Sequence, residues 1–259
     1  MFIFNVILAI IKILLFFILT LFFSIVVLIS PIPQNQRIFL CRVWGWLSLK
    51  VFFIKLNVVG DLYKNKNRPI IIISNHFGLA EILAIFCLYP AHFVAKSEMA
   101  SWALVGWSMR RAGQIFINRK RKDSKDHIDA VLNSLKEYKN VAFFPEGTTS
   151  DSLILLPFKS TLFRSLNNEN FIISATIQPL VITYTKVSGK KITPEQRKKS
   201  SWGDSVGMFE FLFNMSLLPS AELTVKALPH INVDEPIEAR LLVDKLQHDM
   251  NAEFVNLIK

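Results

Sequence analysis

The sequence has few of the residues that mark disulfide, metal and nucleotide sites. Only two of its 259 residues are cysteines, Cys41 and Cys87, and no CxxC or other ligand spacing accompanies them. The chain therefore predicts neither a disulfide framework nor a metal site. It also lacks a Walker loop, an HExxH motif, a dinucleotide fingerprint and an internal repeat, so no metal or cofactor is expected.

Charged residues are scarce as well, at 19% of the chain, whereas hydrophobic residues make up 51%. A typical soluble domain has about a quarter charged residues. The charge that is present gives a formal net charge of +10, which favours contact with the anionic headgroups of a bilayer. Nucleic acid would accept the same charge, but no recognisable nucleic-acid-binding motif accompanies it, so we expect a membrane partner and no nucleic acid.

An almost wholly apolar segment covers residues 1–31, interrupted mainly by Asn5 and Lys12. About 20 apolar residues suffice to cross the hydrocarbon core of a bilayer. A cleaved signal peptide would have a shorter apolar core, of about 7–15 residues, after a basic start. We therefore expect residues 1–31 to be a retained transmembrane or membrane-embedded anchor.

Residues 32–63 mix aromatic and basic side chains, with Trp44 and Trp46 among arginines and lysines. This combination favours the headgroup region, so we expect an interfacial helix here. By the positive-inside rule, the remaining domain, over residues 64–259, should lie on the cytoplasmic face of the inner membrane.

Strand-like and helix-like segments alternate through this domain. Alternation of this kind predicts an α/β domain with a mixed, largely parallel sheet flanked by helices. The expected strands are Ile70–Ser74, His92–Ala95, Ile115–Ile117, Val141–Phe144, Ile177–Tyr184 and Ala221–Ala227. The expected helices are Leu79–Leu88, Trp102–Ala112, Ser124–Tyr138 and a last helix that starts near Asp234 and Pro236 and packs Leu241, Leu242, Leu246, Met250 and Phe254 on the core.

Two segments between these elements have a distinct composition. The polar, basic segment Lys186–Lys199 contains Pro194 and is expected to be a solvated loop. The apolar segment Val206–Leu218 is expected either to pack in the core or to form a helix that dips into the membrane.

A polar histidine, His76, lies where the expected strand Ile70–Ser74 opens into a helix. Ligands of α/β proteins tend to bind at such edges. Glu81 follows five residues later, and on one continuous helix the two side chains would lie roughly 140° apart. They can meet only if His76 precedes the first helical turn. Glu81 would then orient the imidazole while its other nitrogen takes a proton from a substrate hydroxyl.

Three more segments place polar residues next to expected strands. GQIFINR ends at Arg119, FFPEGT places Glu146 in a tight turn, and IQPLV contains Pro179. Together with the NHxxxxE pattern around His76, these blocks resemble the glycerolipid acyltransferase family typified by 1-acylglycerol-3-phosphate acyltransferases. The four blocks stand in the family's order and span residues 75–182, and the phrases VAKSE and LPFK are similar to the family as well.

This resemblance implies transfer of a fatty acyl group from acyl-CoA or acyl carrier protein to a lysolipid hydroxyl, without a cofactor. It implies that His76 is the general base and Glu81 its orienting partner. An arginine such as Arg119 suits a phosphate through its charge and bidentate geometry. The residues that the resemblance implies for substrate binding are Asn75, Lys96, Arg119, Glu146, Gly147, Thr148, Thr149 and Pro179.

The sequence departs from the family pattern at two positions. Glu81 stands where the family usually has aspartate, which keeps the carboxylate but alters its reach. Thr149 stands where the family often has arginine, which removes a positive charge from the acceptor site. Related enzymes acylate lyso-ornithine lipid, which has no phosphate. Lysophosphatidic acid, which would make this an enzyme of phospholipid synthesis, and lyso-ornithine lipid therefore both remain candidate acceptors.

Two further alternatives lie outside this reaction class. The sequence Gly203-Asp-Ser-Val-Gly207 matches the GxSxG pattern of serine hydrolases, with Ser205 as the nucleophile, although no expected strand precedes it. An inactive membrane-binding protein is the second alternative, because Glu81 and Thr149 would then mark lost function.

Overall fold

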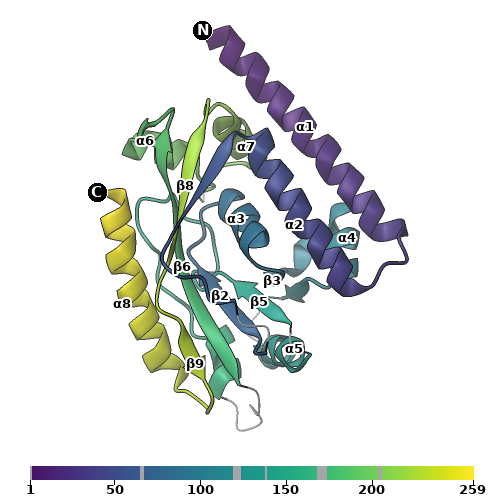
Figure 1. The fold of residues 1–259 in the computed structure, drawn as a ribbon, viewed down its shortest axis with the longest axis vertical. Helices are drawn as coiled ribbons and strands as arrows, with labels where there is room; N and C mark the ends of the chain where they lie inside the picture. Colours follow the sequence, from purple (N-terminus) through teal and green to yellow (C-terminus); the bar gives the residue numbers. More distant parts are fainter. Residues whose placement is uncertain (1, 65–66, 119–123, 138, 168–173, 204–205) are drawn as a thin grey trace.

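The computed structural model describes residues 2–64, 67–118, 124–137, 139–167, 174–203 and 206–259. Within these residues nine strands form one sheet, whose main path runs β1-β8-β6-β2-β5-β3-β4 while β7 and β9 pair with β6 (Figure 1). The strands are β1 (Ile54–Val59), β2 (Ile70–Ser74), β3 (Ala91–Lys96), β4 (Ile115–Ile117), β5 (Asn140–Phe143), β6 (Ala175–Val187), β7 (Lys190–Lys191), β8 (Ala221–Ala227) and β9 (Ile231–Val233).

The sheet is mixed and largely parallel, which confirms the predicted fold class. β2 lies between β5 and β6 and is parallel to both, whereas β6 is antiparallel to β7, β8 and β9. The four isoleucines of β2 are buried, and they alternate between two hydrophobic clusters, one on each face of the sheet. A run of β-branched residues suits a strand that is covered on both faces.

Helices cover both faces of this sheet. On one face, called here the α3 face, lie α1 (Phe2–Ile29), α2 (Gln34–Val51), α3 (Ala80–Leu88) and α7 (Met208–Ser216). On the opposite face, called the α8 face, lie α5 (Ser124–Lys136), the 3₁₀ helix η3 (Leu162–Asn167) and α8 (Ala239–Ile258). The remaining short helices are η1 (Ser97–Ser101), α4 (Val105–Arg111) and α6 (Pro194–Lys199).

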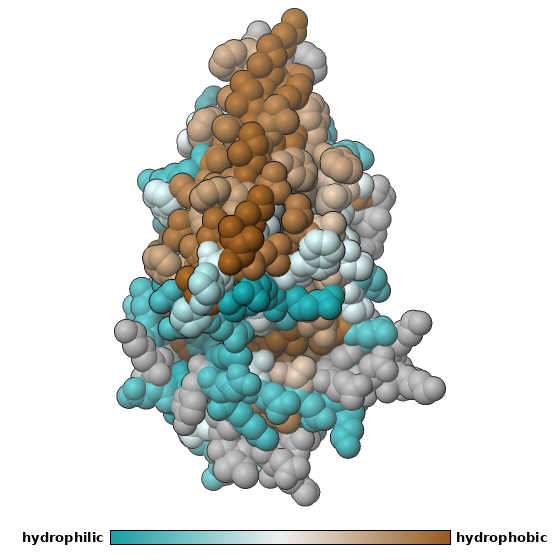
Figure 2. Space-filling view, turned by 90° about the vertical axis from the view of Figure 1, so that its right-hand side faces the viewer, coloured by the Kyte–Doolittle hydropathy of each residue, from teal (hydrophilic) through white to brown (hydrophobic). Residues whose placement is uncertain are grey.

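The helix α1 lies along the outside of the molecule and presents apolar side chains to the surroundings. Figure 2 shows hydrophobic residues gathered over the part of the surface where α1 runs, above a hydrophilic band. Within the described residues it is the one helix that is long and apolar enough to cross a membrane. Only 17% of its most apolar 18-residue segment is buried in the protein.

Several predicted elements agree with the structure, and their errors are local. The strands Ile70–Ser74, Ile115–Ile117 and Ala221–Ala227 have the predicted bounds. The helix predicted over 32–63 is shorter, because Phe53 adopts a φ of 55° and the following residues form β1, which pairs with β8. The membrane contact predicted for this segment stays a prediction.

Three other predicted elements differ from the structure. The predicted loop Lys186–Lys199 contains β7 and α6, because Thr193 forms a capping box with Gln196 and Pro194 occupies the first turn of the helix. The helix predicted from Trp102 begins at Val105, after η1. The last helix begins at Ala239, and Leu241, which was predicted to pack on the core, is 64% exposed.

Candidate active site

His76 and Glu81 meet at the carboxyl end of β2, as the sequence predicts. His76 lies in the turn before α3, and Glu81 lies in the first turn of α3. The imidazole Nδ1 is 2.6 Å from Oε1 of Glu81, whose side chain is fully buried, whereas the His76 side chain remains 18% exposed. The pair is therefore half sheltered, with the carboxylate inside and the imidazole at the surface of a cavity.

The Glu81 carboxylate also shapes the turn that holds His76. Its Oε1 accepts the backbone N–H groups of Phe77, at 2.8 Å, and Gly78, at 2.6 Å. These donors lie in the turn directly before α3, so the Glu81 carboxylate holds the conformation of that turn. A Cβ atom at Gly78 would lie 2.6 Å from the ring of Phe211, so the close approach of α7 requires glycine here.

The turn after β5 holds the backbone of His76 from the other side. The Glu146 carboxylate accepts the backbone N–H of His76 at 2.7 Å and that of Leu156 at 2.9 Å. The Ser150 N–H donates to the His76 carbonyl at 2.8 Å. Burial raises the pKa of Glu146 to about 7, although both backbone N–H groups oppose that shift.

The imidazole also has an aromatic neighbour. The ring of Phe144 lies parallel to it, with 4.0 Å between the ring centroids and an interplanar angle of 6°. The position of Phe144 follows from the sheet, because β2 and β5 are parallel and Ile73 is paired with Phe143. The residues that leave these two strands therefore emerge side by side.

The imidazole lines a cavity of about 1300 Å³ on the α3 face. Most of its wall is apolar or aromatic and comes from α1, α2, α3, α4, α7 and the strand ends, including Phe16, Phe23, Trp44, Phe86, Phe93, Met109 and Leu212. The polar residues on its wall include Lys96, Thr148, Thr149, Lys159 and Arg164. An apolar chain and an anionic headgroup can both be accommodated by such a lining.

The structure brings together most of the predicted site residues that it describes. Lys96, Gly147, Thr148 and Thr149 line the same cavity as His76. Glu146 is buried beside them and holds the His76 backbone. Arg119, Asp204 and Ser205 lie outside the described residues.

Two predicted substrate-binding residues, Asn75 and Pro179, are absent from the cavity lining, and their substrate contacts stay predictions. The Asn75 side chain is buried, and its amide group exchanges two hydrogen bonds of 2.8 Å with the backbone of Ile182 in β6. Pro179 lies within β6 opposite Ile73 and is absent from the cavity lining. Because all polar atoms of the Asn75 amide face the sheet, this side chain positions β6 against the turn that carries His76.

Sequence reasoning assigned no role to Phe144 or Lys159. Phe144 lies two residues before Glu146 in the FFPEGT block, and Lys159 ends the LPFK phrase, so both belong to segments that resemble the family. The Lys159 ammonium lies across the turn: a Cβ atom at Gly147, which has a φ of 70°, would be 2.9 Å from Nζ. A glycine at 147 therefore suits both the backbone conformation and the lysine above it.

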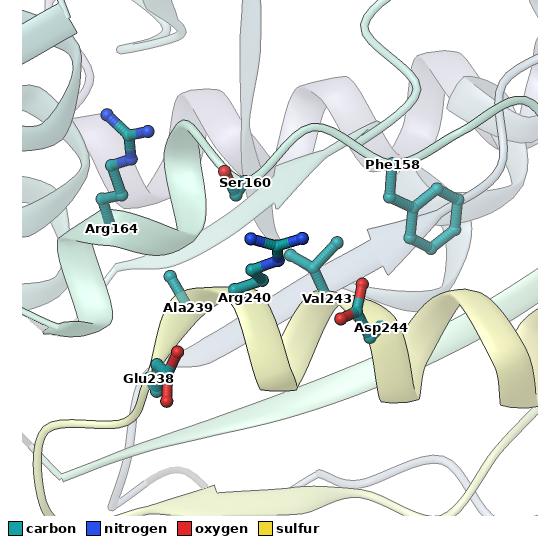
Figure 3. A pocket seen from close by; sticks show the side chains of 8 residues that line it. All are labelled: Phe158, Ser160, Arg164, Glu238, Ala239, Arg240, Val243 and Asp244. Carbon is teal, nitrogen blue, oxygen red and sulfur yellow. The ribbon is translucent and has the colours of Figure 1, made fainter.

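A second cavity, of about 530 Å³, lies between η3 and the start of α8. Figure 3 shows Arg240 and Asp244 on α8 and Glu238 directly before it, with Arg164 on the opposite wall and Ser160 nearby. Its lining carries both signs of charge and no histidine. Arg164 lines both cavities.

Comparisons with known proteins show what this chain is similar to. A family model described as Acyltransferase matches residues 55–183. A 1-acyl-sn-glycerol-3-phosphate acyltransferase from Neisseria gonorrhoeae is 30% identical over 184 residues, which cover 71% of this chain and 68% of that protein. A lyso-ornithine lipid O-acyltransferase from Rhodobacter capsulatus is 31% identical over 137 residues, and the match spans 51% of this chain and only half, 50%, of that relative.

The fold is also similar to a solved structure. The crystal structure of the 1-acyl-sn-glycerophosphate acyltransferase PlsC from Thermotoga maritima superposes with a TM-score of 0.71, at 17% identity, over 98% of this chain and 96% of that chain. At this identity the likeness concerns the fold alone.

Proposed function

This chain belongs to the acyltransferase family, and we propose that it transfers a fatty acyl group from acyl-CoA or acyl carrier protein to the free hydroxyl of lysophosphatidic acid. The product would be phosphatidic acid. The observation that carries this proposal is the His76–Glu81 pair at the edge of a large apolar cavity. Such a cavity suits acyl chains, and the pair suits removal of a proton from a hydroxyl.

His76 and Glu81 have different roles in this reaction. With Nδ1–H donated to Glu81, the imidazole has Nε2 free to accept the proton of the acceptor hydroxyl. The oxygen then attacks the thioester carbonyl, the C–O bond forms, and the collapsing intermediate expels the thiolate, which takes the proton from His76. Glu81 stabilises the transient imidazolium throughout. A thioester is activated enough for this attack without a metal or an acyl-enzyme.

Lyso-ornithine lipid is the second candidate acceptor. Thr149, which lines the cavity, supplies no positive charge there, and relatives such as the Rhodobacter capsulatus protein are named for this acceptor. Lysophosphatidic acid is favoured first because Lys96, Lys159 and Arg164 place cations on the cavity wall, where they would complement a phosphate monoester.

The contacts of Lys12 bear on how α1 lies relative to the domain and the membrane. Its ammonium donates to the carbonyl oxygens of Ser216, at 3.2 Å, and Leu218, at 2.7 Å, at the end of α7, and lies 4.7 Å from the ring centroid of Phe53. The negative end of a helix dipole suits a cation. Moving α1 away to cross the bilayer alone would leave this ammonium unpaired in hydrocarbon, at a cost of about 3 kcal/mol or more.

We therefore favour a pose in which α1 stays on the domain and lies within the cytoplasmic leaflet of the inner membrane. The outer face of α1 is apolar and exposed, for example at Ile3, Ile18 and Ile29. Its inner face lines the cavity, so a lysolipid would reach His76 directly from the bilayer.

Cysteine labelling tests this pose. Ile3→Cys and Ile29→Cys, each in a Cys41→Ala, Cys87→Ala background, would be treated with a membrane-impermeant maleimide in inverted and right-side-out vesicles. Neither position is expected to be labelled from the periplasmic side, and both should become accessible once detergent removes the bilayer. Labelling of the two positions from opposite sides would show instead that α1 spans the bilayer.

Transfer of a labelled acyl group by purified protein tests the reaction itself. Wild type and His76→Ala would each receive acyl-CoA or acyl carrier protein as donor and either lysolipid as acceptor. We expect transfer by wild type and a loss of about 10³-fold or more in the variant. Equal transfer by both proteins would exclude His76 as the base. A fluorophosphonate probe that labels the protein at Ser205 would support the esterase alternative.

A further inference from the structure

Phe144 is placed against His76 by the sheet itself. It follows β5 directly, and β5 pairs in parallel with β2, the strand that leads to His76. Alternation along β5 sends Phe143 to the α8 face, where it contacts Phe163, and Phe144 to the opposite face. The stacked arrangement is therefore a consequence of strand register rather than of a mobile side chain.

The hydrogen bond to Glu81 does not fix the tilt of the imidazole ring. It fixes Nδ1, but a hydrogen bond weakens steeply only when its angle falls below about 120°, so the ring plane can still tilt. The ring torsion of histidine is itself broad. A parallel ring with a centroid separation of 4.0 Å restricts that tilt, and the direction of Nε2 depends on it.

The stacked ring also bears on the charge that His76 acquires. When Nε2 accepts the hydroxyl proton, the imidazolium lies over the face of Phe144, where the negative face of the aromatic quadrupole attracts a cation. The ring is partly buried and lines the cavity beside His76. Desolvation strengthens this attraction, and an apolar substrate in the cavity would provide it.

We propose that Phe144 is a positioning residue for the transfer reaction, whose stacked ring aims Nε2 of His76 at the acceptor hydroxyl and stabilises the imidazolium. This inference rests on the proposed function for its kinetic consequence, but the stack itself does not depend on catalysis. The ring contributes to the chemical step and not to the affinity for either substrate.

The kinetic test compares three variants in detergent-purified full-length protein. For Phe144→Leu, which keeps an apolar side chain but removes the ring, we expect kcat to fall about 10-fold or more while KM for donor and acceptor changes less than about 3-fold. Phe144→Tyr retains the ring and should keep kcat within about 3-fold of wild type. The matched control is Phe163→Leu, a buried ring of the α8 face outside the cavity lining, which should lower Tm and leave kcat near wild type.

A spectroscopic readout separates this inference from the proposed function. Protein with ¹³C-labelled histidine contains five imidazoles, and loss of a signal in His76→Ala identifies His76. Its ring protons should resonate upfield in wild type and Phe144→Tyr and move downfield in Phe144→Leu, even if no acceptor is acylated. An unchanged His76 signal in Phe144→Leu, or a loss confined to the donor KM, would show that Phe144 is only part of the cavity wall and would overturn the proposal.

Discussion

The two faces of the sheet are made by the same strands but are filled in different ways. On the α8 face, α5, η3 and α8 cover a continuous hydrophobic cluster. On the α3 face, α1, α2 and α3 surround a cavity of about 1300 Å³. The strand β2 serves both, since Ile71 and Ile73 point to the α8 face whereas Ile70 and Ile72 point to the α3 face. The helices, and not the sheet, therefore determine which face is hollow.

This difference separates stability from chemistry. The turns after β2 and β5 carry His76, Glu146 and their hydrogen bonds at the edge of the hollow face. The packed face carries apolar side chains that exclude water. We therefore expect substitutions on the α3 face to change activity more than stability, and substitutions on the α8 face to do the reverse.

Glu81→Gln should have the largest effect. It tests whether a substitution on the α3 face lowers activity without lowering stability. The amide oxygen can still accept the N–H groups of Phe77 and Gly78, so the turn should persist. The charge that stabilises the imidazolium is lost, and kcat should fall about 10³-fold. Acyl transfer and thermal unfolding would be measured together. Glu81→Asp, which keeps the carboxylate, should retain more activity, and equal activities for the two variants would contradict this role.

Leu246→Ala makes the corresponding change on the packed face. Leu246 is only 1% exposed within the cluster of the α8 face, and truncation of such a side chain costs about 2–5 kcal/mol of unfolding free energy. The kcat of the protein that remains folded should be unchanged. Leu241→Ala is the matched control on the same helix, because Leu241 is 64% exposed, and it should change stability by less than about 0.5 kcal/mol. A large loss of kcat in Leu246→Ala would contradict the expectation that the α8 face serves stability and not activity.

Glu146→Gln tests whether a buried carboxyl on the α3 face lowers the unfolding free energy as pH rises. The pKa of Glu146 is raised from 4.5 to about 7 by burial, so between these values the folded protein holds a proton that the unfolded chain has lost. The unfolding free energy of wild type should therefore fall as pH rises from 4.5 to 7, by at most about 3 kcal/mol from this group. Chemical unfolding across that range should show a shallower fall in Glu146→Gln, and parallel curves would contradict the burial of an ionisable carboxyl here.

The sequence predicts the parts of this molecule that depend on near neighbours. The run Ile70–Ile73 is apolar and β-branched, so β2 was predictable, and the rotation between His76 and Glu81 required the turn that the structure contains. The four ordered blocks identified the family, which the comparisons confirm. The division of the chain at residues 31 and 63 stays a prediction.

The parts that depend on distant neighbours were not predictable. The hydrogen-bond partner of Asn75 is the backbone of Ile182, 107 residues away, so this contact could not be predicted from the motif, and the substrate-binding role of Asn75 stays a prediction. The stacking of Phe144 on His76 depends on the register of two strands. Leu241 lies one residue before Leu242, about 100° around the helix from the buried stripe of Leu242 and Leu246, and is therefore 64% exposed.

Lys159→Met should have the smallest effect. It tests whether a cation on the cavity wall of the α3 face binds the acceptor. The Lys159 ammonium lies over Gly147 on the cavity wall, and within the described part of the chain it has no hydrogen bond or ion pair. An unpaired cation beside the turn that holds His76 suits the anionic group of the acceptor. We expect KM for lysophosphatidic acid to rise about 10-fold, which is about 1.4 kcal/mol, with kcat within about 3-fold of wild type.

A neutral acceptor distinguishes this role from packing. Monoacylglycerol offers the same hydroxyl without a phosphate, so its KM should be the same in wild type and Lys159→Met. Lys190→Met, an exposed lysine of β7 outside the cavity lining, controls for the loss of one surface charge and should leave both KM values unchanged. If the two acceptors lose affinity equally in Lys159→Met, the lysine supports the turn at Gly147 and the anion is bound elsewhere on the wall, because a purely electrostatic contact cannot act on a neutral headgroup.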